Sequence, residues 1–388
     1  MPSPHDRIPI TPALQLTEVL PVYLCYYLMA VLTVQSNTLQ YKLALLPVGL
    51  VLAFRAATKY DMAAGNPDQK FQNFGHCLGM TTVTMRIVIW TFLTKPLQRT
   101  KPSGSVYRDA LNLMCNSRGV GWNWGMKPSH FPIETRPTYS KRAFLYATVL
   151  RLIKIIFLYD AFNYTVRACA PSGVGTPSGG SIFDPTLPPF QRYALSSFIA
   201  VTYCAVFYYA IEMAYYFATV VGLLIPGLDQ QPSDWPTLSQ SPWLSTSLAD
   251  YWGRRWHQGN RDMFTSLSYP FKILFGRAGL VLGAFFWSAV LHDLGIWGLG
   301  AGTNFSQTGG FFLLMGVGVL VETHWAKITG KEVGGIFGWV WTMAWMVLGG
   351  NILVDGWMKT GLGGGEVLPP AAQPVTLLMR YFAPAVSI

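Results

Sequence analysis

Eight long apolar runs, spread from one end of the chain to the other, constrain the fold more than any other feature. They lie at about 19–35, 43–56, 74–94, 143–162, 193–225, 273–292, 309–322 and 335–354. A helix of about 20 apolar residues crosses the hydrocarbon core of a bilayer, and a helix satisfies all of its backbone polar groups within the segment. The sequence therefore predicts an all-α, polytopic transmembrane helical bundle with about eight spans, in a single membrane domain covering residues 1–388.

The amino-acid composition supports a membrane protein and argues against a soluble one. Hydrophobic residues make up 51% of the chain and charged residues 12%, against about 25% charged residues in typical soluble domains. A soluble fold of this composition would expose large apolar patches. The formal net charge of +10 would suggest nucleic acid for a soluble protein, but no basic cluster with aromatic base platforms is present. We therefore expect membrane lipid around the chain and no nucleic-acid partner.

The distribution of Lys and Arg predicts how the chain is threaded through the membrane. If segments 95–142 and 226–272 are cytosolic loops, that side holds roughly twice as many Lys and Arg as the opposite side, in agreement with the positive-inside rule. Both termini then face the lumen. The first apolar run begins near Val19 without an evident cleavage site, so we expect a retained, multi-pass protein rather than a cleaved signal peptide.

The five cysteines give no indication of a metal site or a disulfide framework. Cys25, Cys77, Cys115, Cys169 and Cys204 are widely scattered and form no Cys-x-x-Cys or Cys/His spacing. At least three of them fall in or beside apolar runs, where cysteine usually packs as a small core residue. No metal ligand is predicted.

The first group of residues that could carry chemistry is the sequence Ser-Leu-Ala-Asp-Tyr-Trp-Gly-Arg-Arg-Trp-His at 247–257. Its Ser and Asp, three positions apart, fit a capping box and predict that a helix begins at Ser247. Helical spacing puts four polar residues on one face and two aromatic residues on another: Asp250, Arg254, His257 and Arg261, then Trp252 and Trp256. A helix lying on the membrane surface and a substrate-binding segment would both show this pattern.

The second group lies in the apolar run that ends at His292. At 100° per residue, Arg277, Ser288 and His292 form a polar stripe along one side of the helix. Gly279 and Gly283, on nearly the opposite side, allow another helix to approach closely. A polar stripe in hydrocarbon faces protein or a water-filled cavity, so His292 is either a reactive imidazole near a buried substrate or a histidine held by a structural hydrogen bond.

Other ionisable residues in the apolar runs are more simply explained as structural. Arg86, Arg151, Lys154 and Glu212 lie within predicted spans. Pairing with another group, or extension of a long side chain to the membrane surface, accounts for most such residues.

The two groups of residues described above, together with a third segment nearer the N-terminus, resemble one family. Asp250-Tyr-Trp-Gly-Arg-Arg-Trp-His257, followed about 35 residues later by Phe286-Trp-Ser-Ala-Val-Leu-His292, resembles the wax-synthase-like branch of the membrane-bound O-acyltransferases. The segment Arg118-Gly-Val-Gly-Trp-Asn-Trp124 is similar to another part of that branch. The resemblance covers roughly residues 80–360 and depends on the order of the motifs as well as on each of them.

The resemblance implies roles for individual residues. His292 matches the histidine that is catalytic in the family. His257 matches a second polar position, which is more often Asn in the plant proteins, so it either takes part in the chemistry or orients the substrate. The remaining motif residues are the implied substrate contacts, with Arg254 and Arg255 near the phosphates of CoA: Asp250, Trp252, Arg254, Arg255, Trp256, Arg118, Trp122, Asn123, Trp124, Trp287 and Ser288.

The implied activity is transfer of an acyl group from acyl-CoA to an alcohol, without a bound cofactor. Similar fungal proteins acetylate terpenoid and meroterpenoid hydroxyls, so acetyl-CoA, a lipophilic alcohol of that type and the endoplasmic reticulum are the expected donor, acceptor and compartment. A wax-ester or sterol-ester synthase that uses a long-chain acyl-CoA is an alternative. A transporter with a polar path through Arg277, His292 and Glu212 is an alternative of another class, although repeated halves are not visible. The sequence does not indicate an oligomeric state.

Overall fold

The computed structural model describes residues 6–126, 131–225 and 230–382. Its contacts cluster into two compact units. The first unit comprises Met1–His130 and Gln258–Leu320, and the second comprises Phe131–His257 and Val321–Ile388.

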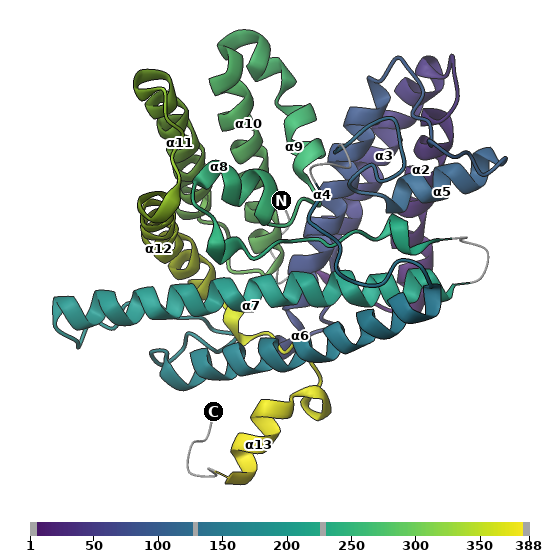
Figure 1. Ribbon diagram of the computed structural model, residues 1–388. Coiled ribbons are helices and arrows are strands. Elements are labelled where there is room, and N and C mark those ends of the chain that lie inside the picture. The colour runs from purple at the N-terminus through teal and green to yellow at the C-terminus, as the bar shows by residue number, and fades with distance from the viewer. Residues whose placement is uncertain (1–5, 127–130, 226–229, 383–388) are drawn as a thin grey trace. The chain divides into compact units, whose positions relative to one another are not determined.

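All eight predicted apolar runs fold as helices, which confirms the all-α fold class (Figure 1). The bounds are α2 (Leu20–Thr33), α3 (Leu39–Lys59), α4 (Phe71–Thr91), α6 (Lys141–Cys169), α7 (Pro189–Leu224), α10 (Tyr269–Gly298), α11 (Phe305–Thr329) and α12 (Gly335–Lys359). Among the described residues, six helical segments are long and apolar enough to cross a membrane, the first being Pro12–Thr33. The helices α4, of 21 residues, and α6, of 29 residues, are long enough to cross a membrane but are not among these six. Strand structure in the described part is confined to the short parallel pair β1 (Ile8–Pro9) and β2 (Tyr60–Asp61).

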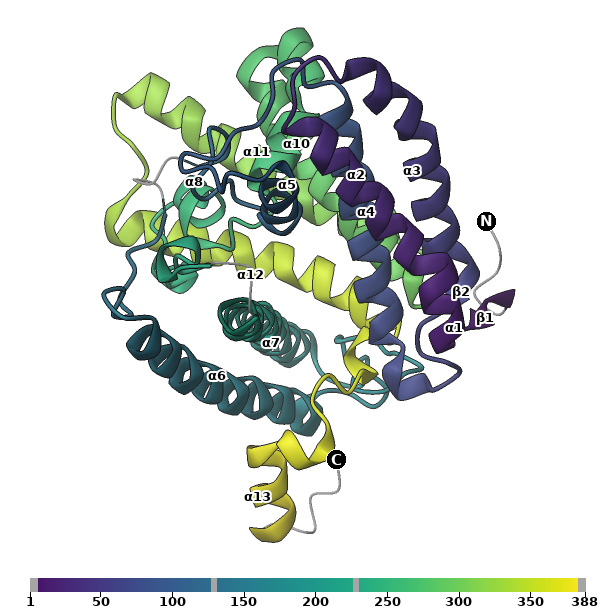
Figure 2. The ribbon, with the colours of Figure 1, turned by 90° about the vertical axis from the view of Figure 1, so that its right-hand side faces the viewer.

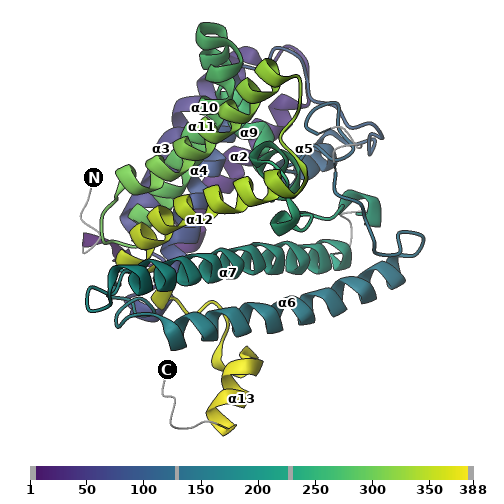
Figure 3. The same cartoon turned by 60° about the vertical axis from the view of Figure 1, so that its left-hand side comes forward.

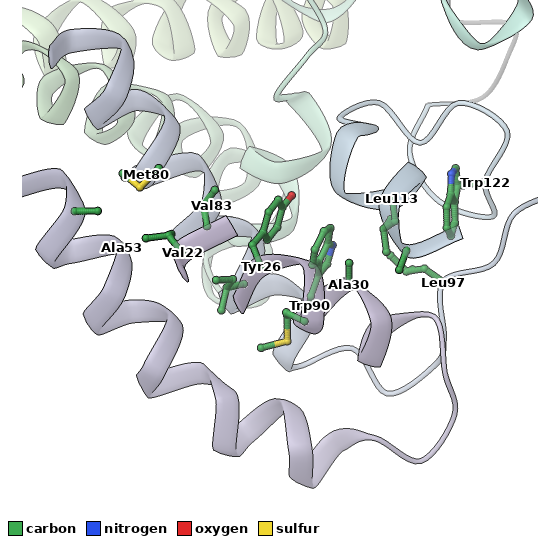
Figure 4. Close-up of a cluster of buried hydrophobic side chains, with 14 residues drawn as sticks. Val22, Tyr26, Ala30, Ala53, Met80, Val83, Trp90, Leu97, Leu113 and Trp122 are labelled. Atoms are coloured by element: carbon green, nitrogen blue, oxygen red, sulfur yellow. The ribbon is translucent and has the colours of Figure 1, made fainter. Parts of the chain in front are cut away.

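The first unit is built on the three neighbouring helices α2, α3 and α4, which run side by side in Figure 2. Their apolar faces bury a continuous cluster that includes Val22, Met80 and Ile87, and Figure 4 shows its members pointing toward one another. The Tyr26 and Trp90 rings stack with centroids 4.9 Å apart. The short helix α5 (Val106–Cys115), capped by Ser105, packs on α2. This packing fixes α4, against which the helix of His292 lies.

The helix α10 is interrupted near the N-terminal end of the predicted apolar run 273–292, just before Arg277. Phe275 and Gly276 have non-helical backbone angles, and Gly276 has φ 59° and ψ −142°, a conformation that glycine adopts without steric cost. A β-carbon on Gly279 would lie 2.0 Å from the Phe271 carbonyl oxygen. The close approach predicted for Gly279 and Gly283 is therefore confirmed, and the neighbour is the chain's own preceding segment, 268–275.

The C-terminal half of α10 is held just as tightly. A β-carbon on Gly298 would lie 2.6 Å from the Asn73 carbonyl oxygen of α4. The buried Arg7 guanidinium donates to the Gly298 carbonyl at 2.8 Å and lies 4.4 Å from the centroid of the Trp297 ring. A cation at these last carbonyls complements the helix dipole. The helix that carries His292 is thus fixed at both ends within the first unit.

The second unit consists of the long helices α6 and α7, packed side by side, with α12 against α7 (Figure 3). The C-terminal helix α13 (Pro374–Phe382) begins at a buried carboxylate of α6. Asp160 accepts hydrogen bonds from the amides of Val375 and Thr376 at 2.7 and 3.0 Å and from the Thr376 hydroxyl. A carboxylate at this position satisfies amides that the helix itself leaves open.

Candidate active site

The segment 247–257 begins as a helix, as its sequence predicts. The Ser247 hydroxyl accepts from the Asp250 amide at 2.9 Å and starts α8 (Leu248–Asp250). The buried Glu322 carboxylate accepts from the amides of Leu248 at 2.6 Å and Ala249 at 2.9 Å. It also accepts from Trp341 Nε1 at 3.0 Å. A sequence-distant carboxylate therefore anchors the start of this segment.

The helix does not continue to Arg261, so the predicted shared face of Asp250, Arg254, His257 and Arg261 is wrong. A single wide turn, η7 (Tyr251–Arg255), follows α8, and Trp256 is extended. A separate helix, α9 (Arg261–Leu267), begins after the turn-forming Gly259 and Asn260. The Arg255 carbonyl accepts from the Gln240 amide at 2.9 Å, which draws it out of a helical hydrogen bond.

The two arginines of the motif share one carboxylate. Asp250 accepts from Arg254 Nε at 2.7 Å and from Arg255 Nε at 2.6 Å. Burial alone would raise the pKa of Asp250, but these two hydrogen bonds outweigh burial and hold it below its usual value. Arg255 also donates to the Gln240 carbonyl at 3.2 Å and is only 18% exposed, whereas the Arg254 side chain is 52% exposed. Arg254 is therefore the better placed of the two to bind an external anion.

His257 lies at the end of this segment in apolar surroundings. Its ring is 5.4 Å from the Trp256 ring, which in turn stacks on Tyr251 at 5.7 Å. Burial lowers the pKa of His257 to about 4. The imidazole is neutral at pH 7, so it can donate one hydrogen bond and accept another. Trp256 and Tyr251 also form part of the wall of an apolar cavity of about 370 Å³ in the second unit.

His292 lies in the first unit, on the part of α10 that follows the break. Its ring stacks face to face on Phe312 of α11, with centroids 5.0 Å apart and planes 4° apart. The preceding Leu291 is buried in a cluster with Met85 and Met263. The imidazole is therefore held in a defined orientation within an apolar layer, and its side chain keeps partial exposure.

Trp287 and Ser288 lie about one helical turn before His292, and Trp287 has a clear packing role. Trp287 packs in the same cluster as Met263 and Leu291, and its Nε1 donates to the Leu267 carbonyl at 3.2 Å. It thus ties α10 to the end of α9 and supports the position of His292. Ser288 is half-buried on the same helix.

The loop 118–124 is mainly a structural element. Trp122 is buried and donates to Asn112 at 2.9 Å, and Asn123 accepts from the Gln98 amide at 3.0 Å. Arg118 is also buried. A β-carbon on Gly119 (φ 67°) would lie 2.2 Å from the Trp124 carbonyl oxygen, so the loop can close on itself only with glycine there. These contacts place Trp124 at the wall of a second cavity.

This second cavity, of about 160 Å³, has both apolar and polar residues in its wall and lies within the first unit. Arg86 lies at its wall, donates to the Tyr26 hydroxyl at 2.9 Å and faces the Trp90 and Trp124 rings at 5.3 and 5.7 Å. Trp124 Nε1 is buried and meets no acceptor in the described part of the chain. Asp262, also at the wall, has its pKa raised by burial, against the opposing charge of Arg86.

Sequence reasoning missed Asp262 and the neighbouring Asn260, and treated Arg86 only as a structural residue. Their place in the sequence could have indicated them, because Asn260 and Asp262 lie three and five residues after His257. The motif residues fall into two groups: Asp250, Trp252, Arg254, Arg255, Trp256 and His257 in the second unit, and Arg118, Trp122, Asn123, Trp124, Trp287, Ser288 and His292 in the first. Within the described ranges, no three His, Cys, Asp or Glu side chains lie together as metal ligands would.

Comparison with known proteins finds a family match over the segment that holds both histidines. A family model described as "Membrane bound O-acyl transferase family" matches residues 235–314, which include both His257 and His292. The long-chain-alcohol O-fatty-acyltransferase of Simmondsia chinensis is 32% identical over 143 residues, 34% of this chain and 39% of that protein.

Two fungal proteins are also similar. The O-mevalon transferase yanI of Aspergillus niger is 26% identical over 55% of this chain and 51% of its own length. The acetyltransferase eriL of Hericium erinaceus is 25% identical over 70% of this chain and 68% of its own length. The alignments cover less than two thirds of the first two of these relatives. Residues 235–314 of the chain therefore resemble the membrane-bound O-acyltransferase family, and the relatives it matches are named as acyl-group or related transferases.

Proposed function

We propose that this protein transfers an acyl group, acetyl from acetyl-CoA, to a hydroxyl of a lipophilic alcohol of the terpenoid or meroterpenoid type. The observation that carries the proposal is the placement of His292. It is a histidine on an apolar helix, stacked on Phe312 at 5.0 Å, within the segment that matches the family. A titratable group held rigidly in an apolar layer is suited to acid–base chemistry.

In the proposed reaction His292 acts as general base. A neutral imidazole nitrogen takes the proton of the alcohol as the alcohol oxygen attacks the thioester carbonyl carbon. The carbon–sulfur bond then breaks, and the departing CoA sulfur takes up a proton as the imidazolium returns to its neutral form. Proton transfer of this kind contributes about 10²–10⁴-fold to a rate. No covalent acyl-enzyme is needed, and apolar surroundings limit hydrolysis of the thioester.

Two residues of the second unit bind the substrates in the proposed reaction. His257, neutral at pH 7, orients a substrate through hydrogen bonds. Arg254, which is half exposed, pairs with a CoA phosphate. The relative from Hericium erinaceus is named an acetyltransferase, which supports acetyl as the transferred group. We expect the endoplasmic reticulum as the compartment, and fractionation of cells that express the tagged protein tests this.

Transfer of a long acyl chain to give a wax or sterol ester is the second candidate function. Its support is the similarity to a Simmondsia chinensis protein named a long-chain-alcohol O-fatty-acyltransferase. The two candidates differ in the donor, so one assay with several donors separates them.

The test is acyl transfer by microsomes that contain the protein, with labelled acetyl-CoA or long-chain acyl-CoA and a panel of terpenoid and fatty alcohols. We expect labelled acetate ester from wild type and none above background from His292→Ala. The matched control is His324→Ala, which changes an exposed histidine and should keep wild-type activity. Normal turnover by His292→Ala would refute the catalytic role. Ester formed only with long-chain donors would favour the second candidate.

A further inference from the structure

The apolar cavity of the second unit has a continuous aromatic wall. Tyr208 of α7 contacts both Trp243 and Trp256, with centroids 5.6 and 6.1 Å apart, and Trp256 stacks on Tyr251. Phe162 of α6 extends the wall by stacking on Tyr209 at 5.6 Å. Rings that lock one another in this way form a rigid surface with little conformational entropy left to lose when a ligand binds. The wall is therefore suited to a rigid, flat-sided guest.

The chemistry of the lining limits the guest to a neutral molecule. Among the described residues that line the cavity, none is Asp, Glu, Lys, Arg or His. The side chains with polar groups among the lining residues belong to three tyrosines, two tryptophans and one cysteine: Tyr208, Tyr209, Tyr251, Trp243, Trp256 and Cys204. Burial raises the pKa of Tyr251 well above its usual value, so its hydroxyl stays neutral. The phosphates of a CoA ester would have no counter-charge here, and burying them would be strongly unfavourable.

The size of the cavity is limited on one side by a glycine. At about 370 Å³ it lies at the lower end of the range for small-molecule sites, about 300–1,000 Å³. Gly350 of α12 faces α7 there. A β-carbon on Gly350 would lie 3.9 Å from Cys204 Sγ and 4.0 Å from Ala200 Cβ, at ordinary contact distance. Alanine fits at this position, whereas a longer side chain must extend into the space.

We propose that this cavity binds the apolar body of the acceptor alcohol, a compact, ring-bearing neutral lipophile, and that Gly350 sets the largest acceptor admitted. The role as acceptor site rests on the proposed function. Trp256 links the cavity to His257, since its ring both lines the cavity and lies 5.4 Å from the imidazole. An alcohol whose ring system lies in the cavity can therefore direct its polar end toward this histidine.

The first test compares Gly350→Leu with Gly350→Ala in the acyl-transfer assay. For Gly350→Leu we expect the ratio of kcat/KM for a polycyclic alcohol to that for a slender linear alcohol to fall at least tenfold, with KM for acyl-CoA within about threefold of wild type. Gly350→Ala should change the ratio by less than threefold. An equal loss with both alcohols would overturn the proposal. So would a change in the preferred acyl-chain length without a change in acceptor preference, because the cavity would then hold the acyl tail.

The second test does not require turnover or a folded leucine variant. In a Cys115→Ser, Cys169→Ser background, which removes the two exposed cysteines, alkylation of Cys204 by N-ethylmaleimide is followed by mass spectrometry. The polycyclic alcohol should slow this reaction at least fivefold, and acyl-CoA alone should not. Equal rates with and without alcohol, or protection by acyl-CoA alone, would refute the site. Protection without any acyl transfer would support the site and count against the proposed function.

Discussion

Replacing Gly279 by alanine should disrupt the packing of segment 268–275 against the part of α10 that carries His292. The new β-carbon would lie 2.0 Å from the Phe271 carbonyl oxygen, where contacts under 3.0 Å essentially do not occur. The two segments must therefore separate by about 1 Å, and the obstacle is backbone, which cannot rotate away as a flexible side chain would. Overpacking of a core typically costs about 1–3 kcal/mol, and a clash with backbone belongs at or above the upper end of that range.

The helix propensity of alanine opposes this loss only in part. An Ala in place of Gly in a helix interior contributes about 1 kcal/mol. The net effect of Gly279→Ala should therefore be a loss of about 2 kcal/mol or more in the free energy of unfolding. The matched control is Gly310→Ala on α11, where a β-carbon meets nothing within 4 Å. It should leave stability equal or slightly higher.

The measurement is the apparent Tm of each purified variant in detergent, read by the loss of the monodisperse peak after heating. We expect Gly279→Ala to melt several degrees below wild type and Gly310→Ala at or above it. If the two variants melted at the same temperature, the tight approach of segment 268–275 to α10 would be wrong, and with it the account of how α10 is held.

Three further predictions address the second unit. Glu322→Ala leaves the amides of Leu248 and Ala249 and the Trp341 indole without their acceptor, so it should destabilise the protein by about 3 kcal/mol or more, and Glu322→Gln by less; equal Tm values for Glu322→Ala and wild type would contradict this. Because burial lowers the folded-state pKa of His257 to about 4 from 6.5, its contribution to stability should be complete above pH 6.5 and fall as pH drops toward 4, with a slope of at most about 1.4 kcal/mol per pH unit. Comparing unfolding against pH for wild type and His257→Asn checks this, and identical pH profiles would refute it. Arg254→Gln should raise KM for acyl-CoA more than KM for the alcohol, and a larger effect on the alcohol would exclude the phosphate role.

Local sequence patterns were enough to predict most of the helices. Each apolar run folds as a helix whose bounds lie within several residues of the run. The reason is that a helix in lipid makes all of its backbone hydrogen bonds within its own segment. The cap at Ser247 and the close approach at Gly279 also followed from local chemistry, namely a hydroxyl near open amides and the absence of a side chain. His292 could be singled out from the sequence because ionisable residues are rare within apolar runs of this length.

The tertiary structure decided what these residues contact. The end of the helix at Arg255 depends on a partner earlier in the chain, the Gln240 amide that donates to the Arg255 carbonyl. Trp122 and Arg255, which the motifs suggested as substrate contacts, donate hydrogen bonds within the protein. Trp122 donates to the Asn112 side chain and Arg255 to the Gln240 carbonyl. The apolar cavity brings together residues as distant as Phe162 and Gly350. A cavity is empty space bounded by long-range packing, and no local pattern in the sequence encodes which side chains will surround it.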